Sequence, residues 1–422
     1  MRLGILVILG ALCLVAAATN SAAANAVDNA TAIEALSILP PETVVRLTLE
    51  KLPQLRSSAM NIDLAKSGKA RLESGSYEWS VRAGASRRTD QSGDRFDEQE
   101  LLVERPVRWF GKADKDLAIG NKGMLMAEAG YADAWHEAGR GLMKDWFDAL
   151  REMAATRKLT EQRDVAERLR TIAEKRVNAG DAARLELLQA DTESRRVAAM
   201  VQQAQLRQDQ AMQTLALSYP GLPQPRITTL PAPHPLLESS AFWLDKITND
   251  NHELALAKAE ADLLLLQAGR VASDRMPDPT VGLRASRERN GRENVYGIII
   301  AIPFAGPART ADVNSATLKA NMASERVTQT QIRVTSSAQR LITESSRTYD
   351  IWQTMVRFQQ QSQQQAAIMM SAYQLGEATI TDALNTRRQA LDAALAAESA
   401  QIDALAAYAR LRLDAHLLWS FE

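Results

Sequence analysis

Long stretches of the chain carry apolar residues at helical spacing and hold no proline. Proline is absent between Pro106 and Pro220 and again after Pro307. Because a proline inside a helix costs about 3 kcal/mol, both stretches can form very long helices. In the second stretch, leucine and isoleucine recur in steps of seven, four, seven and three, the spacing of a coiled-coil seam, at Leu384, Leu391, Leu395, Ile402 and Leu405. Helices of this length predict an extended assembly rather than a globular domain.

Isolated glycines divide each long stretch into two helices. Gly180 is the one glycine between Leu142 and Tyr219, and Gly376 is the one glycine after Pro307. Glycine adopts the positive φ that ends a helix and turns the chain. We therefore expect two helical hairpins, with helices at 112–178 and 182–219 in the first and at 308–375 and 379–420 in the second. Five glycines between residues 120 and 141 predict that the first helix bends or begins late.

Four shorter segments alternate apolar with polar or small residues, at 78–88, 99–109, 279–288 and 294–304. The clearest is the last, with Tyr296, Ile298, Ile300 and Ile302. Alternation over about ten residues is the weak signature of a transmembrane β-strand, and a small soluble β-domain is the alternative. Four strands cannot close a membrane barrel, which takes about eight in a single chain, and an open edge cannot lie in lipid. The chain must then associate, and three copies would give one shared barrel of twelve strands.

The two halves of the chain repeat the same order of features. Gly180 and Gly376 are 196 positions apart, and the proline before each long helix keeps nearly the same interval. We expect two repeats, at 25–219 and 238–422, joined by a proline-rich linker at 220–237. Chance agreement between low-complexity helices is the alternative. The predicted fold class is mainly α with a membrane β-barrel, built from a two-fold internal repeat of a strand pair and a long helical hairpin.

The first residues predict a secretory signal peptide at 1–24. Arg2 gives a basic start, residues 3–18 are apolar, and alanines at 22–24 offer a cleavage site. A membrane anchor is the alternative, but the apolar run is shorter than the ~20 residues of a spanning helix. Cys13 is the single cysteine and lies within this run, so the mature chain is expected to form no disulfide. Leu12 argues against lipidation of that cysteine, which is the minority alternative.

Composition and motifs exclude several function classes. The net charge of the 422 residues is −1, which gives no basic bias toward nucleic acid, so no nucleic-acid partner is expected. No two of the four histidines, His136, His234, His252 and His416, have the i, i+4 spacing of a metal-binding pair. The sequence also contains no phosphate-binding glycine loop. We therefore predict no enzyme activity, no catalytic residue, no cofactor and no specific metal site.

At the two hairpin turns the sequence resembles the TolC-type outer membrane factor family, the outer membrane efflux proteins. The likeness rests on residues 176–182 and 373–379, each followed by a helix start, at 185–188 and 380–384. The resemblance implies a homotrimer with a twelve-stranded barrel in outer-membrane lipid, continued by an α-helical tunnel in the periplasm of a Gram-negative bacterium. It also implies the channel role in a tripartite efflux system, with a periplasmic adaptor protein and an inner-membrane pump of the RND type as partners.

The resemblance places adaptor docking at the turns and the pore entrance just beyond them. The docking residues would be Arg176, Val177, Gly180, Asp181, Tyr373, Leu375, Gly376 and Glu377. The pore entrance would carry Glu186, Asp382 and Asn385. Tyr373 matches a gate tyrosine of the family, whereas Asn385 and Ala378 depart from a second aspartate and a gating arginine. The alternative for Glu186 and Asp382 is that they only complement the helix dipole at a helix start.

Two questions of function stay open at this point. Residues 277–283, with the sequence Pro-Asp-Pro-Thr-Val-Gly-Leu, and the later residues 300–303, Ile-Ala-Ile-Pro, are similar to the heavy-metal branch of the family, which includes the cobalt–zinc–cadmium exporters. Metal cations are therefore one expected cargo. The rival function is that of a periplasmic coiled-coil adaptor, the membrane-fusion protein of an export system. An adaptor usually has one hairpin and β-rich flanking domains, whereas this chain predicts two hairpins and four strands. An envelope enzyme is the third class, and the missing site motifs argue against it.

Overall fold

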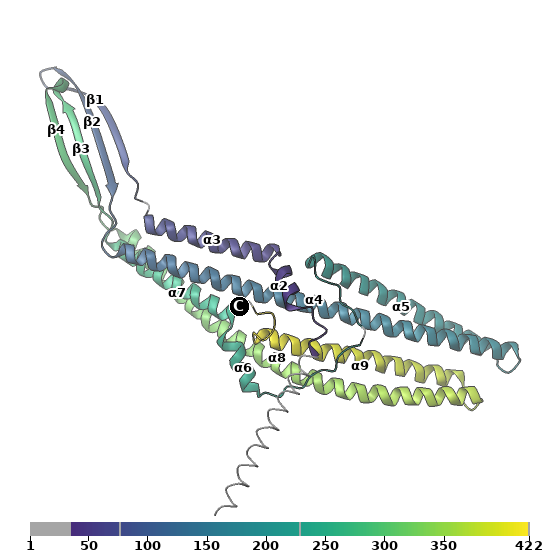
Figure 1. The fold of residues 1–422 in the computed structure, drawn as a ribbon. Coiled ribbons are helices and arrows are strands. Elements are labelled where there is room, and N and C mark those ends of the chain that lie inside the picture. Colours follow the sequence, from purple (N-terminus) through teal and green to yellow (C-terminus); the bar gives the residue numbers. More distant parts are fainter. Residues whose placement is uncertain (1–34, 76, 228, 421–422) are drawn as a thin grey trace, which may run out of the picture. The chain divides into compact units, whose positions relative to one another are not determined.

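The computed structural model describes residues 35–420 except 76 and 228 (Figure 1). The predicted signal peptide at 1–24, with Cys13, lies outside the described residues. The described chain is mainly helical and carries a four-stranded antiparallel sheet, in agreement with the apolar pattern. It divides into a sheet unit, residues 53–134 and 251–334, and a hairpin unit that holds the other described residues. The long helices α4 (Lys112–Asn178) and α8 (Pro307–Leu375) contribute to both units.

The sheet consists of β1 (Ser80–Thr89), β2 (Arg95–Pro106), β3 (Thr280–Glu288) and β4 (Glu293–Ala301). The strands pair in chain order, β1-β2-β3-β4, and each pair is antiparallel (Figure 1). Within the described chain, β1 and β4 are therefore edge strands with a neighbour on one side only. Such an edge presents a row of unpaired backbone N–H and C=O groups.

Two strands end earlier than the sequence pattern predicts. β2 ends at Pro106 rather than at 109, and β4 ends at Ala301 rather than at 304. Pro106 and Pro303 lack the backbone N–H that a ladder needs. β2 also begins before the predicted residue 99, because its first polar residues pair with the end of β1. Trp109 thus lies outside the sheet, and its N–H donates to the carboxylate of Asp278 at 2.9 Å.

The two faces of the sheet differ in chemistry. One row of cross-strand neighbours consists of Val81, Val103, Leu283 and Ile298, and the next row on that face consists of Ala83, Leu101, Ala285 and Tyr296. The opposite face carries charged pairs, Arg82 with Glu104 at 3.3 Å and Arg284 with Glu100 at 3.2 Å. Because side chains alternate along a strand, the middle of the sheet is apolar on one face and charged on the other. Further along the strands, the first of these faces also carries the ion pair of Arg87 with Asp97 at 2.6 Å.

In the sheet unit, α3 (Pro53–Ser74) and α7 (His252–Ala272) pack beside the first part of α4. The glycines of α4 predict a bend or a late start. The helix begins at Lys112, as the predicted bounds of 112–178 have it, so the expectation of a late start is wrong. Gly120 faces α3, and a Cβ there would lie 2.9 Å from Cγ of Lys69. The glycine allows the two helices to approach closely, and this packing offsets its helix propensity, which is about 1 kcal/mol worse than that of alanine.

Asp278, in the segment that resembles the metal-exporting branch, ties the strand ends to the start of α4. Its carboxylate accepts hydrogen bonds from the Tyr77 hydroxyl at 2.5 Å and the Trp109 N–H at 2.9 Å. The ammonium of Lys112 lies 2.9 Å from the same carboxylate and 2.8 Å from Asp274. Lys112 is only 1 % exposed, and a buried ammonium is costly unless it is paired in this way. The aspartate of this segment therefore has a structural task.

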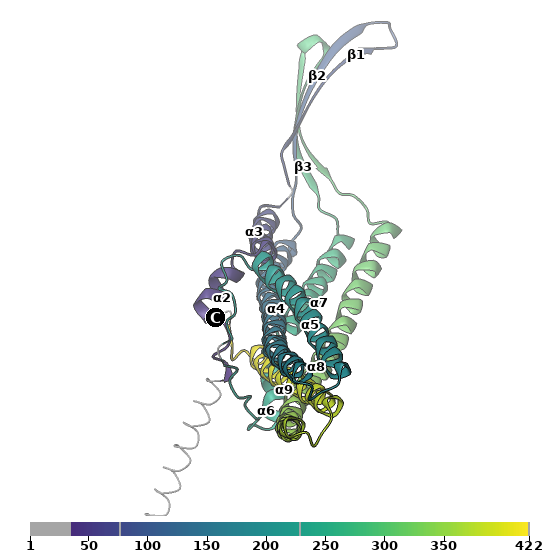
Figure 2. The same ribbon diagram turned by 90° about the vertical axis from the view of Figure 1, so that its right-hand side faces the viewer.

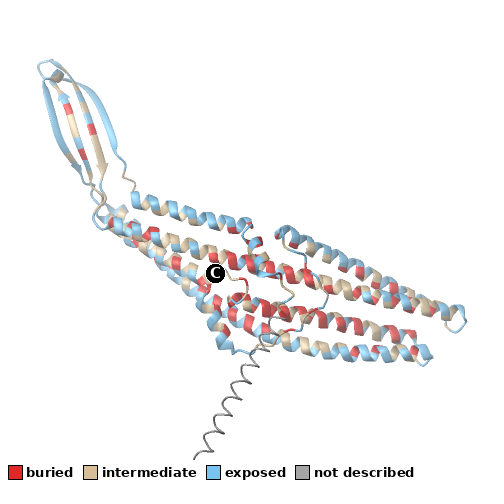
Figure 3. Cartoon of the chain, in the orientation of Figure 1, coloured by how far each residue is buried: buried red, intermediate tan, exposed pale blue. Residues whose placement is uncertain are grey.

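The hairpin unit contains α2 (Glu42–Leu49), α5 (Arg184–Ser218), α6 (Ser240–Asn249) and α9 (Ile380–Asp414), beside the second parts of α4 and α8. In α9, 19 of 35 residues are buried, against seven of 35 in α5 (Figure 3). The buried residues of α9 include four of the five predicted seam positions, Leu384, Leu391, Ile402 and Leu405. In Figure 1 the long helices of this unit follow in the order α5, α4, α9 and α8. Among the described helices, none unites the length and the hydropathy that a membrane crossing requires.

α9 ends at Asp414, earlier than the predicted residue 420. His416 takes a positive φ of 57°. Its N–H donates to the C=O of Leu413 at 3.0 Å, and the N–H of Leu417 donates to the C=O of Arg412 at 2.8 Å. These two bonds satisfy the last carbonyls of the helix and turn the chain away from its axis.

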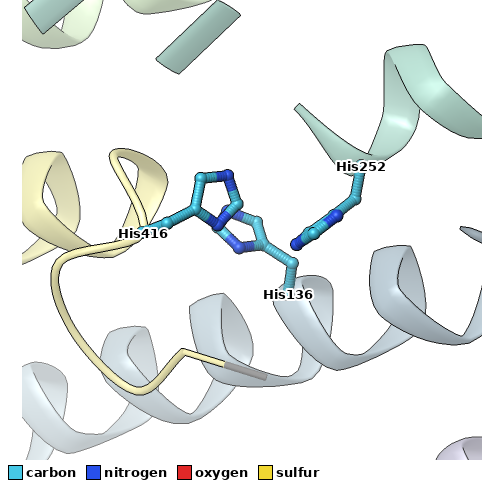
Figure 4. A group of neighbouring side chains, drawn as sticks. All are labelled: His136, His252 and His416. Atoms are coloured by element: carbon cyan, nitrogen blue, oxygen red, sulfur yellow. The ribbon is translucent and has the colours of Figure 1, made fainter. Parts of the chain in front are cut away.

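Asp414 is buried at this helix end among cationic and aromatic neighbours. Its carboxylate lies 3.2 Å from Nε2 of His136 and accepts a hydrogen bond from Arg140 at 2.8 Å. Burial alone would raise the pKa of Asp414, but His136 and Arg140 hold it below its usual value. The rings of His136 and His416 lie 5.1 Å apart between centroids (Figure 4). Figure 4 also labels His252, the first residue of α7 in the sheet unit.

Candidate functional site at the hairpin turns

Both hairpin turns end their first helix with the same hydrogen bonds. The N–H of Gly180 donates to the C=O of Val177 at 3.1 Å, and the N–H of Asp181 donates to the C=O of Arg176 at 2.8 Å. The turn at Gly376 repeats both bonds at the same distances. This pair of bonds is the Schellman motif, which needs a residue of positive φ. The two glycines have φ of +81° and +80°, so the sequence predicts the reason for both turns correctly.

The helices that leave the two turns begin differently. At α9, the hydroxyl of Thr379 accepts a hydrogen bond from the N–H of Asp382 at 3.2 Å and donates to its carboxylate at 2.6 Å. Asp382 is exposed and bonded to the start of its own helix. At α5, Ala183 provides no side-chain cap. The carboxylate of Glu186 in that first turn instead reaches another helix.

Arg176, Tyr373 and Glu186 form a polar cluster that joins three helix ends. The Tyr373 hydroxyl donates to the Glu186 carboxylate at 3.1 Å. The Arg176 guanidinium lies over the Tyr373 ring, 4.9 Å from its centroid, and 3.9 Å from Glu186. A cation over an aromatic face contributes about 0.5–1 kcal/mol where it is exposed. The end of α4, the start of α5 and the end of α8 are thus held together by one tyrosine.

The tyrosine of this cluster is buried in an apolar layer. Tyr373 is 1 % exposed and packs with small and branched residues, namely Leu169, Ala173, Ala190, Ile380, Ala383 and Leu384. Burial raises the pKa of Tyr373, and the neighbouring Glu186 raises it further. The hydroxyl therefore stays protonated at neutral pH and acts as a donor. The sequence places these residues at the turns but does not show that they meet, because Tyr373 and Glu186 are 187 positions apart.

The other predicted docking and pore residues do not join this cluster. Asp181, Glu377 and Asn385 are exposed, and Val177 is half-buried. Leu375 is 76 % exposed although it is apolar. An exposed leucine at a helix end is available for contact with another chain, whereas the buried tyrosine is not.

A second charged group, missed in the sequence, lies one layer behind the turns. Glu193 on α5 accepts hydrogen bonds from Arg388 on α9 at 2.6 Å and from Arg196 at 2.7 Å. Burial would raise the pKa of Glu193, but the two guanidinium groups hold it below its usual value. Little in the sequence indicates this group, because Arg388 stands 195 positions from Glu193. Nearby, Arg387 lies in a groove of about 370 Å³ with Arg168, and burial and this second arginine lower its pKa.

No protein-family model and no curated protein matches the sequence. Among solved structures, the Campylobacter jejuni CmeC outer membrane channel is 14 % identical, with 90 % of this chain and 86 % of that chain covered and a TM-score of 0.72. The outer-membrane channel OprN is 15 % identical, with 90 % of each chain covered and a TM-score of 0.75. The outer membrane protein VceC from Vibrio cholerae is 18 % identical, with 89 % and 94 % covered and a TM-score of 0.72.

This chain has the outer-membrane-channel fold. The match covers about nine-tenths of this chain and of each of the three channels.

Proposed function

We propose that this protein is an outer-membrane channel of the TolC-type family, a non-enzymatic duct through which an efflux system passes its cargo out of the cell. The observation that carries the proposal is the sheet. Its middle is apolar on one face and charged on the other, and both of its edges are open. Lipid tolerates the apolar face but no open edge, so several copies must pair β1 with β4 until the sheet closes. Three copies provide a barrel of twelve strands around a charged lumen.

The repeated element lengths support the proposed internal duplication. α4 and α8 have 67 and 69 residues, α5 and α9 have 35 each, and α3 and α7 have 22 and 21. Two hairpins of equal length also favour a duct over a periplasmic adaptor, for which one hairpin is enough. We propose outer-membrane localisation with the helices in the periplasm, and partnership with an adaptor and an inner-membrane pump, which the family resemblance makes an RND pump.

The proposed docking surface consists of the two turns, with exposed Leu375 and Glu377 as contact residues. The proposed pore entrance carries Glu186 and Asp382, with Asn385 one turn further on. Because Glu186 is shared with Arg176 and Tyr373, loosening of that cluster would open the entrance and free its charge. Metal cations are the proposed cargo only because residues 277–283 and 300–303 resemble the heavy-metal branch, and Asp278 in the first segment serves the structure rather than the cargo.

The proposal is tested by fractionation, mass and conductance together. We expect the mature protein in the outer-membrane fraction, a detergent complex with the mass of three chains, and ion-conducting steps in planar bilayers. A soluble periplasmic adaptor would appear in the soluble fraction without detergent. Mass measurement that finds a monomer or dimer as the only folded species would reject the shared barrel.

A further inference from the structure

Hydrogen bonds fasten the C-terminal segment that follows α9 to other helices of the hairpin unit. Nε1 of Trp135 on α4 donates to the C=O of Trp419 at 3.2 Å. Arg46 on α2 donates to the C=O of Ser420 at 3.2 Å, and Figure 2 shows this end of the chain beside α2. Between these bonds and the end of α9 lies His416, so its imidazole is carried by a segment that is attached at both ends.

The imidazole rings of His136 on α4 and His416 lie together at this place (Figure 4). Their centroids are 5.1 Å apart and their planes are tilted by 43°. A ring nitrogen of one lies within 4.8 Å of a ring nitrogen of the other. Two nitrogens that bind one tetrahedral zinc ion stand roughly 3.3 Å apart, since each Zn–N bond is about 2.0–2.1 Å long. A side-chain movement of about 1.5 Å at most therefore closes the pair around one ion.

Asp414 orients the ring of His136. Its carboxylate lies 3.2 Å from Nε2 of His136 and accepts a hydrogen bond from Arg140 at 2.8 Å. A carboxylate that is paired with a guanidinium accepts hydrogen bonds and does not donate them. Nε2 of His136 therefore carries the proton, and the lone pair is on Nδ1. Histidines that bind metals make such a bond with their second nitrogen, because it fixes the tautomer and the orientation of the ring.

The backbone fixes the position of His416. The residue has a φ of 57°, and its N–H donates to the C=O of Leu413 at 3.0 Å. A residue other than glycine in this left-handed region is uncommon, and it persists where the surrounding structure holds it. One imidazole thus comes from the middle of a long helix and the other from a defined turn, and rigid elements of this kind suit a metal site.

The charges around the two rings balance, so they do not repel a cation. Arg140 is paired with Asp414 at 2.8 Å and with Glu137. Arg410 lies 4.0 Å from the other oxygen of Asp414. Two cations and two anions leave no net charge. Imidazole nitrogens suit Zn²⁺, Cu²⁺ and Ni²⁺, whereas Mg²⁺ and Ca²⁺ take oxygen ligands, so this donor pair selects transition metals.

We infer that His136 and His416 together bind one divalent transition-metal ion, such as Zn²⁺, which joins the C-terminal segment to α4. Water supplies the remaining ligands. The sequence predicts no metal site because only histidines close along the chain give a signal, whereas these two are 280 positions apart. The ion is a resident part of the fold and not cargo, and the inference does not rest on the proposed function.

The test is zinc binding by the mature protein, purified in detergent without a polyhistidine tag and treated with a chelator beforehand. Competition with a colorimetric zinc indicator should show one Zn²⁺ per chain. Thermal unfolding should move to higher temperature with Zn²⁺ but not with Mg²⁺, because an ion that binds only the folded chain stabilises it. Absence of saturable zinc binding would overturn the inference, and a conducting trimer that binds no zinc would leave the duct intact.

Two variants remove the imidazoles and keep the local structure. His416→Asn keeps a residue that tolerates positive φ, and His136→Gln keeps an N–H donor for Asp414. We expect each to weaken zinc affinity at least tenfold and to abolish the zinc-dependent shift in melting temperature. His234→Gln is the matched control, because His234 lies in the same unit against Tyr408, 5.5 Å between ring centroids. Full affinity in either variant, or an equal loss in the control, would contradict the site.

Digestion from the C-terminus tests whether the ion joins the segment to α4. A serine carboxypeptidase needs no metal, so zinc can be varied without affecting the protease. Zn²⁺ should slow removal of the residues after Asp414 at least threefold in the unchanged protein and leave the rate in His416→Asn unaltered. Equal rates with and without Zn²⁺ in the unchanged protein would overturn the joining role.

Discussion

At the scale of single residues, a left-handed backbone ends three of the helices in the hairpin unit. Gly180, Gly376 and His416 all have positive φ and follow the last turn of α4, α8 and α9. Each is accompanied by the same two backbone hydrogen bonds. Two of these positions are the isolated glycines of the long helical stretches, so these two helix ends can be predicted from the sequence. The third is a histidine, which a search for glycine cannot find.

Gly376→Val should strain the second turn without a steric clash. No atom lies within 4 Å of a Cβ built at Gly376, so the cost comes from φ, and a left-handed residue with a side chain costs roughly 1–2 kcal/mol. We expect a lower melting temperature and weaker cross-linking of the adaptor to a cysteine at Glu377. Gly376→Asn is the control, because asparagine tolerates this region. Equal adaptor cross-linking from a cysteine at Ser92, in the β1–β2 loop, would contradict docking at the turns.

Asp278→Asn should destabilise the protein in a pH-dependent way. Burial would raise the pKa of Asp278, but Tyr77, the Trp109 N–H and Lys112 hold it below its usual value. A group whose pKa is lowered by folding contributes stability above its unfolded pKa and loses it as pH falls through the folded pKa. We expect a loss of about 1–3 kcal/mol at pH 7 that shrinks below about pH 4. Thermal unfolding at pH 7 and pH 3 measures this, and an equal loss at both would contradict the charged role.

At the scale of elements, adjacent residues of β4 lie on opposite faces of the sheet and so have different neighbours. Ile300 shares a face with Ile298, and it pairs across the ladder with Val281. Ile299 points to the other face and pairs with Gly282, next to the charged residues of that face. The two isoleucines are therefore a matched pair of sites, equal in chemistry and separated by one position.

Ile300→Lys should weaken membrane insertion, and Ile299→Lys should do so far less. A lysine on the lipid face costs about 2–4 kcal/mol near the bilayer midplane, whereas a lumen-facing lysine stays in water beside Glu104. The yield of folded, heat-modifiable protein in outer membranes gives the comparison. A larger defect in Ile299→Lys would mean that the apolar face is not the lipid face.

The elements also show how far sequence reasoning extends. Proline and glycine act locally, so the mainly helical class and the turn residues follow from their positions. The strand ends at Pro106 and Ala301 were harder to predict from the sequence. The backbone hydrogen bonds of the sheet end near a proline that lacks an N–H donor, whereas the alternation of apolar and polar residues continues beyond it. The contacts of Asp278 and of Tyr373 could not be predicted at all. Each depends on partners that only the folded chain brings near, and neither partner carries a local signal.

At the scale of the whole molecule, three copies would bring six carboxylates to the pore entrance. Like charges so placed raise one another's pKa and attract cations. Glu186→Gln together with Asp382→Asn should lower the cation preference in planar-bilayer recordings and reduce block by multivalent cations. The preference of the unchanged protein should itself shrink at high salt, because the screening length is about 3 Å at 1 M.

The contacts at the turns define the competing outcome. Asp382 is bonded to Thr379 and Glu186 to Tyr373, as expected of acids that only stabilise their helix ends. In that case the double variant would keep the reversal potential and lose some thermal stability, about 0.3–1 kcal/mol per carboxylate through the dipole. An unchanged reversal potential would therefore remove these residues from the pore.

In the proposed trimer, the open edges of the sheet also affect how a single chain assembles. Before it pairs with two others, each chain would display β1 and β4 as templates on which any extended peptide can add a strand, including an identical chain in the wrong register. Closure by three chains would slow steeply as their concentration falls, while capture by a holding chaperone or a protease needs only one chain. The amount of assembled protein should consequently rise more steeply than its rate of synthesis. Below a threshold rate of synthesis, most chains should be degraded before they assemble.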